Sequence, residues 1–522
     1  MFRAIRCTTA LCRAGFVFAR HGVFGLLTPE DLPAPARFGL KLARLLERKS
    51  ETGGASTRLS AALADLGPSY IKLGQFLATR RDIVGEALAA DLALLQDKLP
   101  PFPDAEARKA IERTLGAPVE ALFSELGPPI AAASIAQVHK GVTKDGRKVA
   151  VKVLRPDVDR RFTRDLESFF FAARMVERFS VEARRLRPVE VVQTLARSVE
   201  LEMDFRLEAA AMSELAVNIA KDEGFDVPAP SWTLTGKSVL TTDWIDGIPL
   251  SDVAAVRAAG HDLPALGASV IQHFLRHAMR DGFFHADMHQ GNLFVRPDGG
   301  LVAVDFGIMG RLSPKDRLFL AEILYGFIVR DYRRVAQVHF DAGYVPETQD
   351  VEMFAQALRA IGEPLQEKTA AEISMARLLG QLLEVTDLFD MQTQPQLILL
   401  QKTMVVVEGV ARNLDPNVNM WTTSEPVVRH WMESNLGAEG KLHEAAEGAQ
   451  TLGRFVAAVP DLLMRAERMT EMAQVMAANG VRLDAETVDA IARAQAARTR
   501  SGRIALWIGA LSLALLAARF FM

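Results

Sequence analysis

Cysteine is scarce in this sequence, and neither sign of charge is in clear excess. Only Cys7 and Cys12 are present among 522 residues, so the chain can build neither a disulfide framework nor a four-thiolate zinc site. A reducing compartment is therefore expected. Lysine plus arginine (61) nearly balances aspartate plus glutamate (64), which gives a formal charge of -3. No global field favours nucleic acid, and no nucleic-acid partner is predicted.

Long hydrophobic runs are also scarce, and the clearest one lies at the C-terminus. Residues 504–518 carry no charge, and the 19 residues from 504 to 522 contain a single arginine. A helix of that length covers about 28 Å, close to the hydrocarbon thickness of a bilayer. We predict a transmembrane anchor over residues 501–522, with a hairpin helix buried against the body as the alternative. Basic residues typical of a cytoplasmic flank precede it: Arg493, Arg498, Arg500 and Arg503.

The N-terminus is basic and contains no acidic residue. Its first 22 residues carry Arg3, Arg6, Arg13 and Arg20 among apolar side chains. Residues 1–30 are predicted to form an amphipathic helix on a membrane surface. A mitochondrial transit peptide has the same arginine bias and is the alternative.

Between these ends, the hydrophobic pattern first favours helices and then strands. Residues 31–125 are predicted to form a helical N-terminal extension, because apolar residues recur there at three- and four-residue spacing. Residues 126–250 are predicted to form a small lobe with a sheet. Its β-rich runs are 150–154, which follows a turn signal at Lys144–Arg147, and 238–244.

The second half of the chain is predicted to be mainly helical. Residues 251–440 form a helical lobe in this prediction, with a β-like interlude at 284–307, and residues 441–500 form further helices. The fold class is therefore α+β, with a small sheet lobe followed by a helical lobe.

The most informative stretch for chemistry contains Asp287, Asn292 and Asp305. The asparagine follows the first aspartate by five residues, and an Asp-Phe-Gly triplet begins thirteen residues later. This spacing can place oxygen ligands around the metal-bridged phosphates of a nucleotide. Oxygen donors of this kind suit Mg²⁺. Each residue alone is equally typical of a turn without chemistry, but the three together favour a nucleotide site.

Lys152 lies within an apolar run, where a lysine is costly unless its ammonium meets an anion. A nucleotide phosphate and a glutamate are both suitable partners. Glu208, 56 residues later on an expected helix, is the predicted glutamate.

These residues and three further motifs resemble the UbiB family of atypical protein-kinase-like proteins, which is linked to ubiquinone biosynthesis. The resemblance extends over residues 60–310, with the C-terminal anchor in addition. The family's Lys-x-Gly-Gln motif corresponds to Lys72–Gln75, and its Glu-x-Asp motif to Glu202–Asp204. An alanine-rich nucleotide loop corresponds to Ala131–Val138, and the kinase-type loop and Asp-Phe-Gly follow in order.

The resemblance implies a protein-kinase-like two-lobed fold that binds ATP and Mg²⁺. It implies that Lys152 pairs with Glu208, that Asp287 is the base-like aspartate, and that Asn292 and Asp305 bind the metal. The residues implied to bind the nucleotide in the alanine-rich loop are Ile130, Ala131, Ala132, Ala133, Ser134, Ile135, Ala136, Gln137 and Val138.

The same resemblance places Lys72 and Gln75 over the active site as catalytic residues. With the regulatory residues Glu202 and Asp204, they are expected to block the usual approach of a protein substrate. ATP hydrolysis or work on a small lipid is therefore expected in place of protein phosphorylation.

Two departures from the family pattern affect these expectations. Met288 and Gln290 stand in the catalytic loop where prolines are common, so a less rigid loop is expected. No Ala-Pro-Glu segment follows the Asp-Phe-Gly, so an ordinary peptide-binding activation segment is not expected.

The function implied is a membrane-associated, kinase-like ATPase required for ubiquinone biosynthesis. Its expected partners are polyprenylphenol precursors of ubiquinone, the membrane and other enzymes of the pathway. The protein is expected to act on these precursors, to present them to the other enzymes, or to regulate the ring hydroxylation steps. Two alternatives stay open, a small-molecule or lipid phosphotransferase and a nucleotide-binding pseudokinase scaffold. A bacterial inner membrane with the globular part in the cytoplasm is the expected location, and a mitochondrial inner membrane is the alternative.

Overall fold

The computed structural model describes residues 2–26, 55–78, 100–179, 187–366, 388–391 and 395–436, together with Val84, Leu88, Leu92, Arg184 and Val385. The chain divides into two units, residues 1–432 and 433–522, and residues 433–436 are the described part of the second. The predicted helices at 441–500 and the predicted anchor at 501–522 lie outside the described residues.

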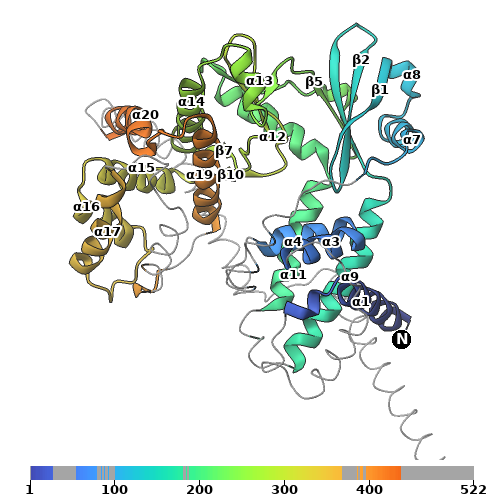
Figure 1. The fold of residues 1–522 in the computed structure, drawn as a ribbon, viewed down its shortest axis with the longest axis horizontal. Coiled ribbons are helices and arrows are strands. Elements are labelled where there is room, and N and C mark those ends of the chain that lie inside the picture. The colour runs from blue at the N-terminus through green and yellow to red at the C-terminus, as the bar shows by residue number, and fades with distance from the viewer. Residues whose placement is uncertain are drawn as a thin grey trace, which may run out of the picture. The chain divides into compact units, whose positions relative to one another are not determined.

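A four-stranded antiparallel sheet forms the first half of the kinase-like part (Figure 1). Its strands in spatial order are β1 (Phe123–Ala132), β2 (Ala136–Thr143), β3 (Lys148–Leu154) and β5 (Val239–Asp243). The predicted turn joins β2 to β3, where the Gly146 N–H donates to the Thr143 carbonyl at 3.1 Å. The strands expected at 150–154 and 238–244 are thereby confirmed.

The alternation of side chains along β3 decides where Lys152 points. Val149, Val151 and Val153 are fully buried on one face of the sheet. There they contact helix α7 (Asp104–Leu115), followed by the short helix α8 (Val119–Leu122). Because successive residues of a strand face opposite sides, Lys152 must project from the other face.

Five helices form a layer that includes the N-terminus. Helix α3 contacts α1 and α4, helix α9 contacts α1, α4 and α11, and α11 also contacts α4 (Figure 1). Their bounds are α1 (Phe2–Arg20), followed by a 3-10 turn η1 (Val23–Leu26), α3 (Ala55–Leu66), α4 (Pro68–Ala78), α9 (Val158–Phe179) and α11 (Pro188–Glu202).

Helix α1 confirms the helix expected at the N-terminus and has two unlike faces. Cys7 and Ala14 are buried, whereas Ile5 and Phe16 are about half exposed. One face therefore packs on the protein while apolar side chains remain on the other.

Helix α12 (Phe205–Asn218) carries Glu208 and starts directly after α11. Glu208 therefore lies on a helix, as expected, and a break after Glu202 separates this helix from α11. Asp204 has extended backbone angles, and its side chain accepts a hydrogen bond from the Arg206 N–H, which is the geometry of an N-cap.

The remaining elements form a mainly helical part with short strands, as expected. Strands β4 (Phe225–Asp226), β9 (Leu301–Ala303), β8 (Leu293–Val295) and β6 (Ile248–Pro249) form one small sheet, and β7 (Phe283–His285) pairs with β10 (Met309–Arg311). The helices are α13 (Val253–Ala258), α14 (Leu263–Arg276), the π-helix η4 (His277–Asp281), α15 (Pro314–Ile328), α16 (Tyr332–Asp341), α17 (Val351–Gln366), α19 (Pro395–Leu414) and α20 (Met420–Leu436), with a 3-10 turn η3 (Trp232–Leu234) before β5.

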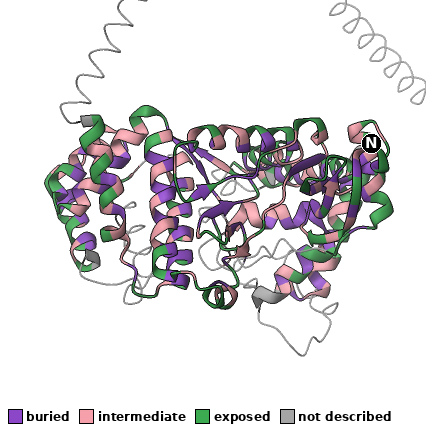
Figure 2. Cartoon of the chain, turned by 90° about the horizontal axis from the view of Figure 1, so that it is seen from above, coloured by how far each residue is buried: buried purple, intermediate pink, exposed green. Residues whose placement is uncertain are grey.

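Helix α14 is central to this part. Val270, Ile271 and Phe274 on it are fully buried, and α19 packs along it. Figure 2 shows the buried positions recurring on one side of the helices and on the strands, as expected of amphipathic elements around a shared core.

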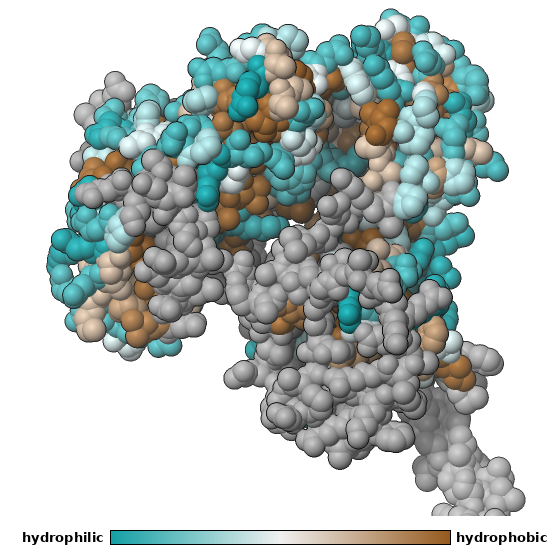
Figure 3. Space-filling view, viewed as in Figure 1, coloured by the Kyte–Doolittle hydropathy of each residue, from teal (hydrophilic) through white to brown (hydrophobic). Residues whose placement is uncertain are grey.

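Figure 3 shows hydrophilic residues over much of the described surface on this face, with hydrophobic residues in scattered areas. Within the described residues, no helix has the length and hydrophobicity needed to cross a bilayer.

Candidate functional site

Lys152 is the centre of a three-residue ion-pair cluster. Its Nζ lies 2.8 Å from Oε1 of Glu208 and 2.8 Å from Oδ1 of Asp305. The predicted pairing of Lys152 with Glu208 is therefore confirmed, and Asp305 joins the same ammonium. Three elements meet at this point, strand β3, helix α12 and the segment after β9.

Burial and charge set the protonation of this cluster. The Lys152 side chain is 19% exposed and that of Glu208 is 7% exposed. Burial opposes the charge on Lys152, but Asp305 and Glu208 outweigh it and raise the pKa of Lys152. The Lys152 ammonium holds the pKa of Asp305 well below its usual range. Asp305 is therefore an anion at neutral pH, with its side chain 54% exposed and available to a ligand.

Glu208 is fixed from two sides. Its Oε1 accepts the Phe306 N–H at 3.2 Å in addition to the Lys152 ammonium. Burial raises the pKa of Glu208, and Lys152 acts against this rise. The hydrogen bond from Phe306 links α12 to the Asp-Phe-Gly segment, so the position of that helix and the position of Asp305 depend on each other.

Backbone hydrogen bonds bring the catalytic loop beside Asp305. The Val304 N–H donates to the Asn292 carbonyl at 2.9 Å, and the Ala286 N–H donates to the Ile308 carbonyl at 3.0 Å. The Asn292 amide Nδ2 donates to the Asp287 carbonyl at 3.0 Å. Asp287 and Asn292, predicted from spacing alone, therefore lie in one loop bonded at both ends to the segment that carries Asp305.

His285 adds a further connection between these two segments. Its Nε2 lies 3.0 Å from the Val304 carbonyl, and its Nδ1 lies 3.1 Å from the Asp287 N–H. A neutral imidazole protonated on Nε2 satisfies both contacts, and burial lowers the pKa of His285 accordingly. The His285 ring thus orients the backbone at Asp287.

The expectation of a less rigid catalytic loop is not supported by the contacts of that loop. Met288 is fully buried, and Gln290 Oε1 accepts a hydrogen bond from the Asn413 amide at 2.9 Å. The Thr403 hydroxyl lies 3.1 Å from the Ala286 carbonyl and 2.8 Å from the Leu399 carbonyl of its own helix, so its single proton is shared between the two. Burial and helix α19 hold the loop where relatives commonly have prolines.

The alanine-rich segment forms a tighter turn than predicted. Ile130, Ala131 and Ala132 belong to β1, and Ala136, Gln137 and Val138 belong to β2, which leaves Ala133, Ser134 and Ile135 as the turn. Ile130 is exposed, whereas residues 134–137 are buried. The predicted eight-residue loop is therefore a three-residue turn between two paired strands.

Arg155 determines the shape of this turn. Its side chain donates to the carbonyls of Ala133 and Ser134, each at 3.2 Å, and its N–H donates to the Ile135 carbonyl at 2.7 Å. The three carbonyls of the turn thus all accept hydrogen bonds from Arg155, the residue that follows β3. The turn is held by these bonds without any glycine.

Lys72 lies on α4 and reaches toward the same site. Its Nζ is 2.7 Å from Oε2 of Glu202 at the end of α11, and both side chains are 15% exposed. The positive charge of Lys72 also contributes to lowering the pKa of Asp305, after the larger effect of Lys152. The Lys-x-Gly-Gln helix and the Glu-x-Asp motif are therefore joined by an ion pair.

The other two motif residues have different surroundings. Gln75 lies on α4 just after Gly74 and is partly buried. Asp204 pairs with Arg206, whose Nη2 lies 2.6 Å from its Oδ2, and caps α12. Asp204 thus positions the helix of Glu208, while Glu202 holds Lys72.

Sequence reasoning did not identify Arg155, Thr403 or Asn413. Arg155 directly follows the strand of Lys152, and this position could have indicated that its side chain lies near the site. Thr403 and Asn413 contact residues 117 and 123 positions away in the chain, and no local pattern indicates such pairs.

The fold and the site define a protein-kinase-like protein: a lysine on a sheet paired with a helix glutamate, followed by a loop aspartate and asparagine and an Asp-Phe-Gly. The ABC1 atypical kinase-like domain matches residues 94–339, and the UbiB helical domain matches residues 358–419, which include all of α19. The chain belongs to the UbiB family of atypical kinase-like proteins.

Bacterial relatives match most of the chain. A protein named probable protein kinase UbiB from Marinobacter nauticus is 41% identical over 437 residues, which cover 82% of this chain and 80% of the relative. The protein of the same name from Aeromonas salmonicida is 38% identical over 464 residues, covering 88% and 85%.

A solved structure shares the fold. The complex of Rv3197 with erythromycin from Mycobacterium tuberculosis is similar with a TM-score of 0.51 and 24% sequence identity, over 76% of this chain and 98% of that one.

Proposed function

We propose that this chain is a membrane-associated, kinase-like ATPase that acts in ubiquinone biosynthesis. The observation that carries the proposal is the Lys152 cluster, in which one ammonium meets Glu208 and Asp305 at 2.8 Å beside the loop of Asp287 and Asn292. Membership of the UbiB family supports the link to ubiquinone, and polyprenylphenol precursors are the proposed lipid partners.

The residues present fit a nucleotide with Mg²⁺. Asp305 offers a half-exposed carboxylate whose lowered pKa keeps it charged, and Asn292 offers an amide oxygen, because its Nδ2 is already used on Asp287. Both are hard oxygen donors of the kind Mg²⁺ prefers. Bound Mg²⁺ would neutralise charge that develops on the phosphates during phosphoryl transfer.

The chain's own residues have distinct roles in this proposal. Lys152 holds the phosphates through its ammonium, and Glu208 keeps that ammonium in place. Asp287 orients the attacking water or hydroxyl at its carboxylate. The turn Ala133–Ile135 covers the phosphates, and Arg155 keeps the turn closed.

Protein phosphorylation is not proposed as the main activity. Lys72 is anchored to Glu202 and its charge acts on Asp305, so α4 occupies part of the approach to the site in this proposal. Gln75 on the same helix and Asp204 at the start of α12 complete this obstruction. A lipid or water is then the favoured acceptor.

The membrane association is proposed for both ends of the chain. Helix α1 places Ile5 and Phe16 on its exposed side, among Arg6, Arg13 and Arg20, which is the composition of an interfacial helix. Residues 501–522 are proposed as the anchor. The bacterial relatives favour a bacterial inner membrane, where other ubiquinone-pathway enzymes are proposed partners.

The test is Mg²⁺-dependent phosphate release by the full chain in liposomes, with and without a polyprenylphenol analogue. We expect lipid-stimulated release that Asp305→Asn lowers by about 100-fold or more, with no phosphorylated lipid formed. A phosphorylated lipid would favour the phosphotransferase alternative. Tight nucleotide binding without release would favour the pseudokinase scaffold, and release unchanged in Asp305→Asn would refute the proposed site.

A further inference from the structure

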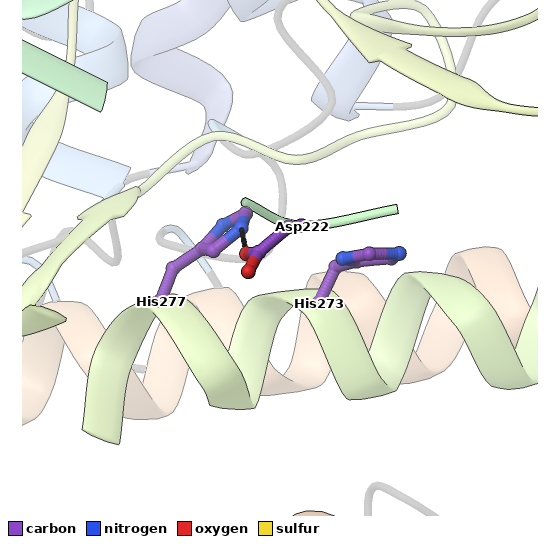
Figure 4. A group of neighbouring side chains, drawn as sticks. All are labelled: Asp222, His273 and His277. Atoms are coloured by element: carbon purple, nitrogen blue, oxygen red, sulfur yellow. Dashed lines mark ion pairs between the residues drawn. The ribbon is translucent and has the colours of Figure 1, made fainter. Parts of the chain in front are cut away.

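A second cluster of metal-ligating side chains lies outside the candidate functional site. It consists of Asp222, in the loop after α12, His273 on α14 and His277 at the first residue of η4, which follows α14 directly (Figure 4). The two histidines are four residues apart, so they lie one helical turn from each other on the same face. Asp222 approaches that face from a different segment.

The ligand atoms of the cluster lie somewhat farther apart than they would around a bound metal ion. One ligand atom from each residue lies within 4.8 Å of the others, and Nε2 of His277 is 3.9 Å from Oδ2 of Asp222. Ligand atoms around a tetrahedral Zn²⁺ with bonds of about 2.1 Å lie about 3.4 Å apart. The ligand atoms would therefore have to approach one another by between about 0.5 and 1.4 Å, which side-chain rotation can supply.

His277 gives an independent reason to expect a ligand. It is fully buried, yet neither of its ring nitrogens has a hydrogen-bond partner. Buried polar groups without partners are rare and need an explanation. His277 also begins a π-helix, and such single-turn insertions occur frequently at functional sites.

The electrostatics keep the histidines in the form that binds metal. Burial lowers the pKa of His273 to about 4 and that of His277 to about 3, so both imidazoles are neutral at pH 7. Burial opposes ionisation of Asp222, but hydrogen bonds from Arg280 hold its pKa below the usual range. The set is thus two neutral imidazoles and one carboxylate.

Two arginines surround the cluster, and both bear on the inference. Arg280 donates to both oxygens of Asp222, at 2.5 and 3.0 Å, which leaves a second lone pair on each oxygen. Such an outer contact orients a ligating carboxylate. Arg276 Nη1 lies 3.3 Å from Nδ1 of His273 and would have to turn outward if that nitrogen binds the metal.

We propose that Asp222, His273 and His277 hold a Zn²⁺ ion, with a water in the fourth position of the tetrahedron. Two imidazoles and a carboxylate select Zn²⁺ over the harder ions Mg²⁺ and Ca²⁺. The site joins the loop that follows α12, the helix of Glu208, to α14 in the helical part. Phe225 packs on both imidazoles, with its ring centroid 5.1 Å from that of His273 and 4.8 Å from that of His277.

The direct test is zinc content of the full chain, purified without a histidine tag and with Mg²⁺ present to occupy oxygen-donor sites. After exposure to Zn²⁺ and gel filtration, we expect about one equivalent retained per chain and an increased Tm. X-ray absorption should show only nitrogen and oxygen ligands, with two imidazoles. Substitution by Co²⁺ should give tetrahedral visible bands without a thiolate charge-transfer band, which excludes Cys7 and Cys12 as the ligands.

Single variants assign the ligands. His273→Gln, His277→Gln and Asp222→Asn should each weaken Zn²⁺ binding by at least about 100-fold. His339→Gln is the matched control, because His339 is a partly buried helix histidine that bonds to the Val335 carbonyl outside the cluster. Less than a tenth of an equivalent in the wild type, or cluster variants that bind like the wild type, would overturn the proposal. The wild-type stoichiometry decides even where a variant fails to fold.

Discussion

At the scale of single residues, Lys152 shows how sequence and structure together define a role. Its position in an apolar strand predicted a buried anion partner, and Glu208 is that partner. Strand alternation explains why it points away from the valines on the same strand. The second partner, Asp305, is 153 residues away, and only the folded chain brings it to 2.8 Å.

The same scale explains which site residues the sequence revealed. Asp287, Asn292 and Asp305 were predicted because they follow one another at short intervals in the sequence. In the structure, backbone hydrogen bonds join the loop of Asp287 and Asn292 to the segment of Asp305. The cluster of Asp222, His273 and His277 was not found, because its carboxylate comes from a loop about fifty residues before the histidines. A lone acid in a loop carries no local signal of this kind.

The two buried histidines predict how stability depends on pH in metal-free buffer. Their folded-state pKa values, about 4 for His273 and about 3 for His277, lie below the unfolded value of about 6.5. The unfolded chain therefore binds more protons below pH 6.5. Their contribution is complete above that pH and is lost as the pH falls toward 4 and 3.

Lowering the pH from 7.5 to 5.5 should therefore decrease the free energy of unfolding by about 1 kcal/mol for each imidazole. Denaturant titrations at both pH values check this, with His273→Gln/His277→Gln as the comparison. We expect a smaller decrease in the double variant. An equal decrease in both proteins would mean that these imidazoles do not stay neutral in the fold.

At the scale of elements, helix α19 supports the catalytic loop from the UbiB helical domain. Thr403 is fully buried and shares its hydroxyl proton between the Ala286 and Leu399 carbonyls, and the Asn413 amide donates to Gln290. The two contacts lie at opposite ends of the loop that carries Asp287. A family-specific helix thus substitutes for the prolines common in this loop.

Thr403→Val tests this support with little change in side-chain volume. Loss of the hydroxyl removes the bond to Ala286 and should cost about 1 kcal/mol of stability. Phosphate release should fall severalfold because Asp287 follows Ala286 directly. Thr403→Ser keeps the hydroxyl and should retain the activity. Equal release by the valine variant and the wild type would show that α19 does not position the loop.

The ion pair between α4 and α11 is a second element-scale contact that can be measured. Lys72→Glu and Glu202→Lys should each lower Tm, because each places like charges together where both side chains are 15% exposed. The double swap should recover part of the loss, with a coupling of about 1 kcal/mol or more. Thermal unfolding of the four proteins gives this coupling directly. Strictly additive losses would mean that the pair does not join the two helices.

The sequence predicted which segments form strands better than it predicted the residues at which those strands begin and end. The β-rich runs around Lys152 and at 238–244 are strands, because β-branched residues and turn signals define them locally. The alanine-rich segment was expected to be a longer loop, because the resemblance to the family implies a nucleotide loop over Ala131–Val138. Pairing between β1 and β2 overrides that preference and leaves only residues 133–135 as a turn.

At the scale of the whole molecule, family membership and fold agree, and the membrane attachment is the part that stays a prediction. Helix α1 packs on the protein through one face and presents Ile5 and Phe16 on the other. The charge-free run at 504–518 lies outside the described residues. The contributions of the two ends of the chain to membrane attachment therefore need to be measured separately.

Removal of residues 501–522 should release the protein from membranes if that segment is the main anchor. Flotation with liposomes checks this for the truncated chain and for the full chain carrying Ile5→Ser and Phe16→Ser. We expect most of the truncated protein to remain soluble and the double serine variant to float. Continued flotation after truncation, lost only when the serine changes are added, would instead assign the attachment to α1.

The proposed function requires that Lys152, Asp305 and Asn292 form an Mg²⁺-dependent nucleotide site. Equilibrium binding of ATP to the full chain, measured with Mg²⁺ and with a chelator, tests it most directly. We predict binding that needs Mg²⁺ and is weakened by about 100-fold in Asp305→Asn, while circular dichroism shows an unchanged fold. Binding that is equally tight with the chelator, or in Asp305→Asn, would contradict the account.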